Sequence, residues 1–190
     1  MAIKLGISKA YDRVEWQFLR KMMIRLGFDE RWVTLAMETI HTASYLVLIN
    51  GEPKGFIQPT RGIKQGDPLS PYLFLLCTEG LSTMLKRAEE QKRIQGIVSC
   101  KGRVHVSHLL FADDCLLFCQ AKIEDCQNLL HLLHSYEMAS GQAINRRKTT
   151  LFFSKKHKGK HQAGCAKHAG STSISWLWAI PRVAYDCRKV

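Results

Sequence analysis

Large apolar residues recur every three or four positions in the first part of the chain, a spacing typical of helices that pack on one side. One such stretch begins near Glu15 and ends at Gly27. A second follows Asp29, whose side chain suits the N-cap of a helix. The residues expected to form its buried face are Trp32, Leu35, Ala36 and Ile40. Two longer helices are predicted over residues 70–91, where a Ser-Pro pair suits the first turn, and over residues 123–138.

Strand-like segments complete the pattern. Residues 45–49 are continuously apolar and lead into Asn50-Gly51, a strong hairpin-turn signal. A second hairpin is predicted to join residues 104–110 to residues 115–119. The other strand-like segments are residues 2–7, 56–58 and 150–153. This order of elements predicts an α+β domain in which helices cover one face of an antiparallel sheet and leave the other face open.

Composition narrows the class of protein. Hydrophobic residues make up 46% of the 190 positions, which is enough for one domain with a real core. No apolar stretch reaches membrane-spanning length, and the first residues lack a signal-peptide core. We therefore expect an intracellular protein without a membrane partner, in a compartment and oligomeric state that the sequence leaves open. Seven cysteines include no Cys-x-x-Cys pair, which favours reduced thiols over a disulfide framework.

The net charge of +12 suggests a nucleic-acid partner, but the charge is unevenly distributed. Residues 155–190 hold eight Lys and Arg against one acid, and large apolar residues are almost absent from residues 155–175. We expect residues 1–154 to form the folded domain and residues 155–190 to be a basic, disordered tail. The tail contains a pattern with zinc-compatible spacing but without apolar support, made of His157, His161, Cys165 and His168.

Asp113 and Asp114 stand in the middle of an apolar run, at the expected turn of the second hairpin. Carboxylates in such a setting are costly to bury without a cationic or hydrogen-bonding partner. A turn breaks the alternation that sends neighbouring strand residues to opposite faces, so both carboxylates could approach one ion. Oxygen ligands of this kind suit Mg²⁺ or Mn²⁺. The alternative is an ordinary turn, in which Asp is a common residue.

A glycine-rich loop at residues 61–68 is a second candidate site. Gly62 and Gly66 would let the backbone approach a ligand closely, and Arg61 and Lys64 could face phosphates. The alternative is a flexible helix-entry loop with solvated charges.

Four segments occur in an order and at spacings that match a known family. They read KAYDRVEW from Lys9, RGIKQGDPLSPYL from Arg61, FADD from Phe111 and SGQAINRRKT from Ser140. Over about residues 1–154 these motifs resemble the reverse transcriptases of plant non-LTR (LINE-type) retrotransposons. The resemblance implies an RNA-directed DNA polymerase, a nucleotidyltransferase with a right-hand fold. This chain would hold its palm and part of its fingers.

The resemblance also implies roles for individual residues. Asp113 would be a principal metal ligand and Asp114 its neighbour in the catalytic turn, while Lys148 would assist the pyrophosphate leaving group. Tyr11 would screen the sugar 2′ position of the incoming nucleotide. The loop residues expected to contact nucleotide and template are Arg61, Gly62, Gln65 and Gly66. The implied partners are an RNA template, a DNA primer and deoxynucleoside triphosphates, with Mg²⁺ or Mn²⁺ as the cofactor.

The chain departs from the family at Gly6. The family reads Leu-Asp-x-Ser-Lys-Ala-Tyr-Asp where this chain reads LGISKAYD from Leu5, and the missing Asp is the third metal carboxylate. Asp12 lies six residues further on and is not expected to replace it. Loss of one member of a catalytic unit commonly costs several orders of magnitude in rate, so we expect a catalytically dead polymerase. The alternatives are a non-catalytic nucleic-acid-binding remnant and a non-functional relic of a retrotransposon.

Relative to the family, the chain is also expected to be truncated at both ends. Met1 matches an internal family position, and residues 155–190 do not resemble the palm segment and thumb that should follow. The segment Ile174-Ser175-Trp176-Leu177 could be encoded by bases that, in another frame, give the Tyr-Leu-Gly that the family carries about there. We therefore hypothesise a frameshift in a decayed element.

Overall fold

The computed structural model of the chain describes residues 1–98 and 105–153. The helices are α1 (Trp16–Arg25), α2 (Glu30–His41), α3 (Ser70–Glu90) and α4 (Ile123–Ser140). The strands are β1 (Ala2–Leu5), β2 (Ile7–Ser8), β3 (Tyr45–Ile49), β4 (Glu52–Ile57), β5 (Ile97–Val98), β6 (His105–Val106), β7 (His108–Phe111), β8 (Asp114–Phe118), β9 (Ala143–Ile144) and β10 (Thr150–Phe152).

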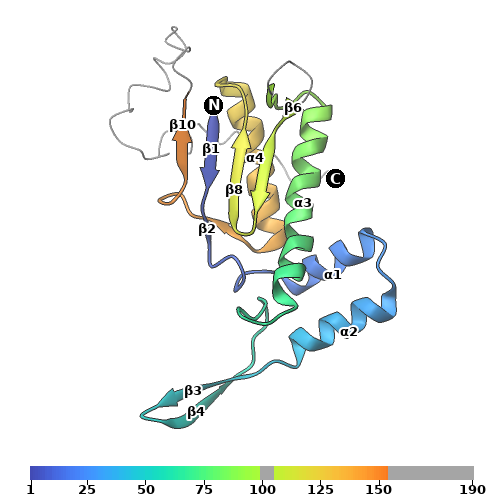
Figure 1. Cartoon of the computed structure of the whole chain (residues 1–190), viewed down its shortest axis with the longest axis vertical. Helices are drawn as coiled ribbons and strands as arrows, with labels where there is room; N and C mark the ends of the chain where they lie inside the picture. The colour runs from blue at the N-terminus through green and yellow to red at the C-terminus, as the bar shows by residue number, and fades with distance from the viewer. Residues whose placement is uncertain (99–104, 154–190) are drawn as a thin grey trace.

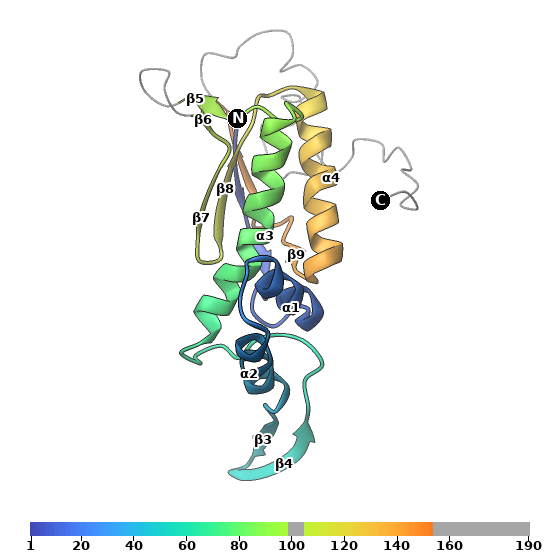
Figure 2. The same cartoon turned by 90° about the vertical axis from the view of Figure 1, so that its right-hand side faces the viewer.

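A four-stranded antiparallel sheet in the order β10-β1-β8-β7 organises the fold (Figure 1). On the central strand β1, Ile3 lies opposite Leu117 of β8 and Leu151 of β10. α3 and α4 lie side by side against one face of this sheet (Figure 2). On the opposite face Leu109 and Phe111 are exposed. The predicted α+β arrangement, with helices on one face and the other face open, is confirmed.

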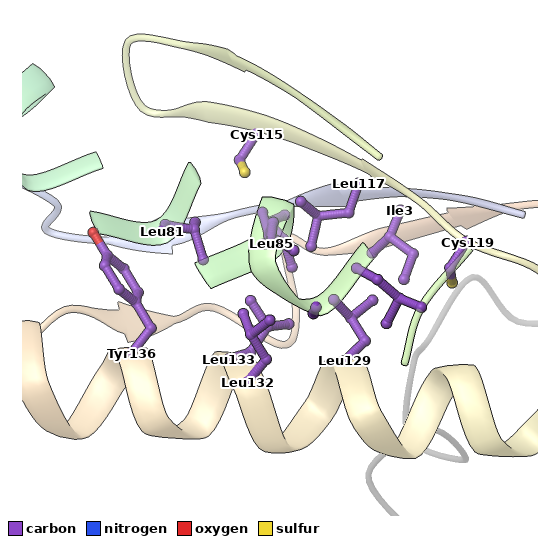
Figure 3. Close-up of a cluster of buried hydrophobic side chains, with 13 residues drawn as sticks. Ile3, Leu81, Leu85, Cys115, Leu117, Cys119, Leu129, Leu132, Leu133 and Tyr136 are labelled. Atoms are coloured by element: carbon purple, nitrogen blue, oxygen red, sulfur yellow. The ribbon is translucent and has the colours of Figure 1, made fainter. Parts of the chain in front are cut away.

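Two cores hold the fold together, and α3 belongs to both. Between the sheet and the helices, Leu81 and Leu85 of α3 are buried with Leu117 of the sheet and with the apolar side of α4 (Figure 3). At its other end, α3 contributes Leu73 and Phe74 to a core shared with α1 and α2. Because α3 spans both cores, it fixes the loop before it relative to the sheet.

The buried face of α2 differs from the predicted one. Asp29 accepts a hydrogen bond from the N–H of Arg31 at 2.9 Å, as expected of an N-cap. The prediction for Trp32 and Leu35 was wrong, because these side chains are 39% and 62% exposed, and Trp32 stacks on Phe28. The buried residues of α2 are Val33, Ala36, Met37 and Ile40. Both stripes satisfy helical spacing, so periodicity alone does not choose between them.

Strands β3 and β4 form a hairpin that extends away from the rest of the chain (Figure 1). Positive φ values of 52° at Asn50 and 82° at Gly51 form the predicted turn. The return strand begins at Glu52, earlier than predicted, and every residue of both strands is exposed. Leu48 and Phe56, for example, are 69% and 70% exposed. The hairpin therefore adds no side chain to either core.

The basic tail and the absence of a membrane-spanning segment were also predicted from the sequence. Residues 155–190, with their histidine and cysteine pattern, lie outside the described residues. Within residues 1–98 and 105–153, none of the helices combines the length and the apolar composition that a bilayer-crossing segment needs.

Candidate functional site

The hairpin turn between β7 and β8 carries the two aspartates. Phe111 pairs with Asp114 across the hairpin, so Ala112 and Asp113 form a two-residue turn. Ala112 has a φ of 50°, an uncommon value for a residue with a side chain. Asp113 and Asp114 are both exposed, with Asp114 as the first residue of β8. Burial therefore does not by itself require a metal ion here, contrary to the reasoning from the flanking apolar run.

Asp114 has a cationic partner on the neighbouring strand. Lys4 Nζ lies 3.1 Å from Asp114 Oδ1, and the two side chains are 48% and 62% exposed. An ion pair this exposed contributes roughly 0–1 kcal/mol to stability. Cys115 follows Asp114 on β8. Burial, and to a smaller extent the negative charge of Asp114, raises the pKa of the Cys115 thiol to about 12. This thiol stays protonated at neutral pH and does not act as an anionic ligand.

The glycine-rich loop before α3 is attached to the segment after β2. Ile63 N–H donates to the carbonyl of Tyr11 at 3.0 Å, and Gly62 N–H donates to that of Val14 at 2.8 Å. The Gly62 carbonyl accepts from Trp16 Nε1 at 2.6 Å. A Cβ on Gly62 would lie 2.6 Å from the carbonyl oxygen of Asp12. Gly62 is thus explained by close backbone packing, and both of its backbone polar groups are used inside the protein.

The other loop residues face solvent. Arg61 Nη1 lies 3.6 Å from Glu15 Oε1, and both side chains are about half exposed. Lys64, Gln65 and Gly66 are exposed, as a loop that meets a ligand would require.

Tyr11 is oriented by a buried aromatic side chain. Its ring stacks on Phe74 of α3 with centroids 4.7 Å apart and planes 10° from parallel. Phe74 is 1% exposed, while Tyr11 is half-buried. The stack fixes one face of Tyr11 and leaves its ring at the border of the loop.

Gln142 joins the first and fourth motifs, a role that was not predicted from the sequence. Its Oε1 accepts a hydrogen bond from the Tyr136 hydroxyl at 2.7 Å, and its Nε2 donates to the carbonyl of Ala10 at 3.1 Å. Glu15 N–H donates to the carbonyl of Ser140 at 2.9 Å. A glutamine beside the helix-ending Gly141 was the available signal, because a buried amide needs partners on both of its polar atoms.

Strand pairing and these hydrogen bonds bring the predicted site residues to one end of the sheet. The β7–β8 turn, β2 and the start of α3 lie at that end (Figure 1). Lys148 is exposed on the loop between β9 and β10, next to Gly6. In the part of the chain that the structure describes, no three His, Cys, Asp or Glu side chains form a group that could hold a metal ion. The turn offers two carboxylates, and position 6 offers none.

An antiparallel sheet backed by helices on one face, with paired aspartates on a hairpin turn at its end, is the arrangement of a polymerase palm. Apo telomerase from Candida tropicalis, truncated from its C-terminal domain, shares this fold with a TM-score of 0.60 and 18% sequence identity. The similarity covers 83% of this chain and 31% of that one. A sequence model of the family described as "Reverse transcriptase (RNA-dependent DNA polymerase)" matches residues 1–177, which extends past residue 154. The chain belongs to the reverse transcriptase family.

Two relatives add detail. The chain is 33% identical over 146 residues to a retrovirus-related Pol polyprotein from the type-1 retrotransposable element R2 of Popillia japonica, covering 77% of this chain and 23% of the relative. It is 56% identical over 69 residues to an uncharacterized mitochondrial protein of Arabidopsis thaliana, covering 36% of this chain and 57% of that protein. The chain thus spans under a quarter of the Pol polyprotein and just over half of the mitochondrial protein. The predicted membership among non-LTR retrotransposon reverse transcriptases is confirmed, and the plant source stays a prediction.

Proposed function

We propose that this chain is the palm and part of the fingers of an RNA-directed DNA polymerase whose nucleotidyl-transfer activity has been lost. One observation carries the proposal. The β1–β8 register and the Ile63–Tyr11 hydrogen bond bring three family motifs to one end of the sheet although they lie far apart in sequence. An RNA template, a DNA primer and a deoxynucleoside triphosphate are the partners that such a surface would take.

The residues at the turn do not fit a site for two divalent ions. Two such ions bring four positive charges, and a further carboxylate from another strand is normally needed to hold them. Here Asp113 and Asp114 have no carboxylate beside them at Gly6, and Lys4 adds a positive charge next to Asp114. Mg²⁺ or Mn²⁺ bound in this chain would be held by the two turn carboxylates alone. Efficient phosphoryl transfer is not expected from this set.

The residues expected to face the substrate support this proposal. Tyr11, held flat on Phe74, would border the sugar of a bound nucleotide. The exposed loop residues Arg61, Gln65 and Gly66 would meet the nucleotide and template, with the buried Gly62 shaping the loop beneath them. An ammonium such as that of Lys148 would stabilise charge on a leaving pyrophosphate. We therefore expect the chain to bind nucleic acid and nucleotide although it no longer catalyses nucleotidyl transfer.

Primer extension tests this proposal. Purified full-length chain is incubated with an RNA template, a labelled DNA primer and deoxynucleoside triphosphates, with Mg²⁺ or Mn²⁺. We expect no extension above that of the Asp113→Ala variant, while a gel-shift assay shows that both proteins bind the template–primer duplex. Extension by the unchanged chain that Asp113→Ala abolishes would show that the polymerase is active.

A second candidate is a non-catalytic nucleic-acid-binding remnant, favoured by the net charge of +12. Binding of this kind uses contacts to phosphates. The logarithm of the binding constant should therefore fall steeply and linearly with the logarithm of the salt concentration. Removal of residues 155–190 should then lower both the affinity and the salt slope. If neither RNA nor DNA binds at low salt, the chain is a non-functional relic, and both proposals fail.

A further inference from the structure

Gly6 lies in direct contact with the loop that carries Lys148. The carbonyl oxygen of Gly6 accepts a hydrogen bond from Asn145 N–H at 2.6 Å, and its own N–H donates to Thr149 Oγ1 at 3.2 Å. Asn145 also shapes the loop, because its Oδ1 accepts from the backbone N–H groups of Arg147 and Lys148 at 3.0 and 3.2 Å. The loop is therefore held against the backbone of Gly6 from both ends.

This contact leaves no room for a side chain at position 6. A Cβ atom there would lie 2.6 Å from Lys148 Cβ and 3.3 Å from the Lys148 carbonyl carbon. Those atoms are at the root of the lysine, so a change of its rotamer would not move them. Gly6 does not have a positive φ, and its backbone conformation is open to other residues. Glycine is therefore explained at this position by the close approach of the 145–149 loop and not by its backbone conformation.

The same position borders the aspartate turn. Leu5 of β1 pairs with Cys115 of β8, and continuing this register by one pair brings Gly6 opposite Asp114. A carboxylate at position 6 would approach the turn only if the Lys148 loop moved away. Meanwhile the ammonium of Lys4 supplies a positive charge beside Asp114.

We infer that position 6 and Lys148 are sterically coupled, so that the missing metal carboxylate cannot be restored by Gly6→Asp alone. The loop at residues 145–149 has closed over the space that this side chain needs. With the loop in this position, removal of the Lys148 Cβ relieves the shortest contact, at 2.6 Å. The steric coupling stands on the contact itself, whereas its consequence for metal binding rests on the proposed function of the turn.

A double-mutant cycle in thermal unfolding tests the coupling, with Ala as the smallest side chain at position 6. We expect Gly6→Ala to lower the unfolding midpoint by roughly 5 °C. In a Lys148→Gly background, which removes the Cβ, the same substitution should cost about 1 °C or less. Lys148→Ala is the matched control, because it removes the charge and the chain but keeps the Cβ, and it should give no such rescue.

Each outcome of this cycle either supports or overturns the steric coupling between position 6 and Lys148. Failure of Gly6→Ala to fold, with folding regained only in the Lys148→Gly background, supports the coupling as well as a shifted midpoint does. The coupling is overturned if Gly6→Ala is as stable as the unchanged chain, or if Lys148→Ala rescues as well as Lys148→Gly.

Mn²⁺ binding, followed by the electron paramagnetic resonance signal of the free ion, tests the consequence. We expect Gly6→Asp combined with Lys148→Gly to bind Mn²⁺ at least about tenfold more tightly than Gly6→Asp combined with Lys148→Ala. Equal, tight binding by both, and by Gly6→Asp alone, overturns the inference. Coupling in the unfolding cycle without any gain in Mn²⁺ affinity keeps the steric inference and counts against the proposed metal role of the turn.

Discussion

The Tyr136 hydroxyl donates a 2.7 Å hydrogen bond to Gln142 Oε1, and both residues are almost fully buried. The amide nitrogen of the same Gln142 donates to Ala10, so one side chain ties α4 to the segment that carries Tyr11. A buried polar group left without a partner costs about 1–3 kcal/mol.

From this pair we expect Gln142→Leu to lower the free energy of unfolding by about 1–3 kcal/mol, because the Ala10 carbonyl loses its side-chain donor and Tyr136 its nearer acceptor. Urea denaturation measures the change. Gln17→Ala, an exposed position on α1, is the control and should stay within about 0.5 kcal/mol. Equal effects of the two variants would show that the buried bridge is not stabilising.

Two glycines with the same positive φ should respond differently to a methyl group. Gly62 and Gly66 both have φ of 88°, so alanine strains either by about 1–2 kcal/mol. At Gly62 the new Cβ would also meet the carbonyl oxygen of Asp12 at 2.6 Å, whereas at Gly66 nothing lies within 4 Å. We therefore expect Gly62→Ala to be clearly more destabilising than Gly66→Ala in chemical denaturation. Matching losses would mean that the close approach at Gly62 is easily relieved.

Phe74, on which the ring of Tyr11 stacks, should contribute strongly to the free energy of unfolding. Phe74→Ala removes a ring that is 1% exposed, and we expect a loss of about 3–5 kcal/mol in the free energy of unfolding. Phe74→Leu keeps most of the burial and should cost less. Tyr72, two residues earlier and 67% exposed, provides the control. A loss for Tyr72→Ala as large as that for Phe74→Ala would contradict the packing of α3 described above.

We expect His108 to make the free energy of unfolding depend on pH. Burial lowers the pKa of His108 below its ordinary 6.5, and the charge of Lys86 lowers it further, while Glu89 and Glu79 act weakly in the opposite direction. Ser82 and Ser107 lie within hydrogen-bond distance of its two ring nitrogens, at 3.0 and 3.1 Å. Below pH 6.5 the unfolded chain binds this proton more readily than the folded one, so stability falls as the pH falls.

We expect unfolding free energies measured between about pH 7.5 and about pH 5 to show this loss, and His108→Asn to reduce it. His134→Asn, at an exposed position on α4, is the control for the loss of a histidine side chain. A pH dependence that is identical in all three proteins would exclude His108 as its source.

The sequence alone predicts the elements of this fold better than their contacts. Helical and strand-like spacing identified the four helices and both hairpins, because each pattern is local and repeated. The face of α2 was wrong because two overlapping stripes of apolar residues obey the same period. The contact between Gly6 and Lys148 could not be predicted, since the two positions are brought together only by the complete sheet and its connecting loop.

The same limit applies to the site. Motif order located the aspartate turn, the loop and Tyr11, because the family that the chain resembles carries those residue types at fixed intervals. It did not reveal Gln142 as a bridge or Lys4 as the partner of Asp114. Both depend on the strand register and on side-chain packing, which a list of motifs does not contain.

The position of β1 has a kinetic consequence. The central strand β1 is synthesised before both of its neighbours in the sheet, β8 and β10, which follow only at residues 114–118 and 150–152. During synthesis β1 must therefore wait with both hydrogen-bonding edges unpaired while α1, α2 and α3 are already complete. Pairing over such long separations folds slowly and exposes the chain to aggregation. The helical end of the protein is thus expected to fold first, with the sheet and its aspartate turn assembled last.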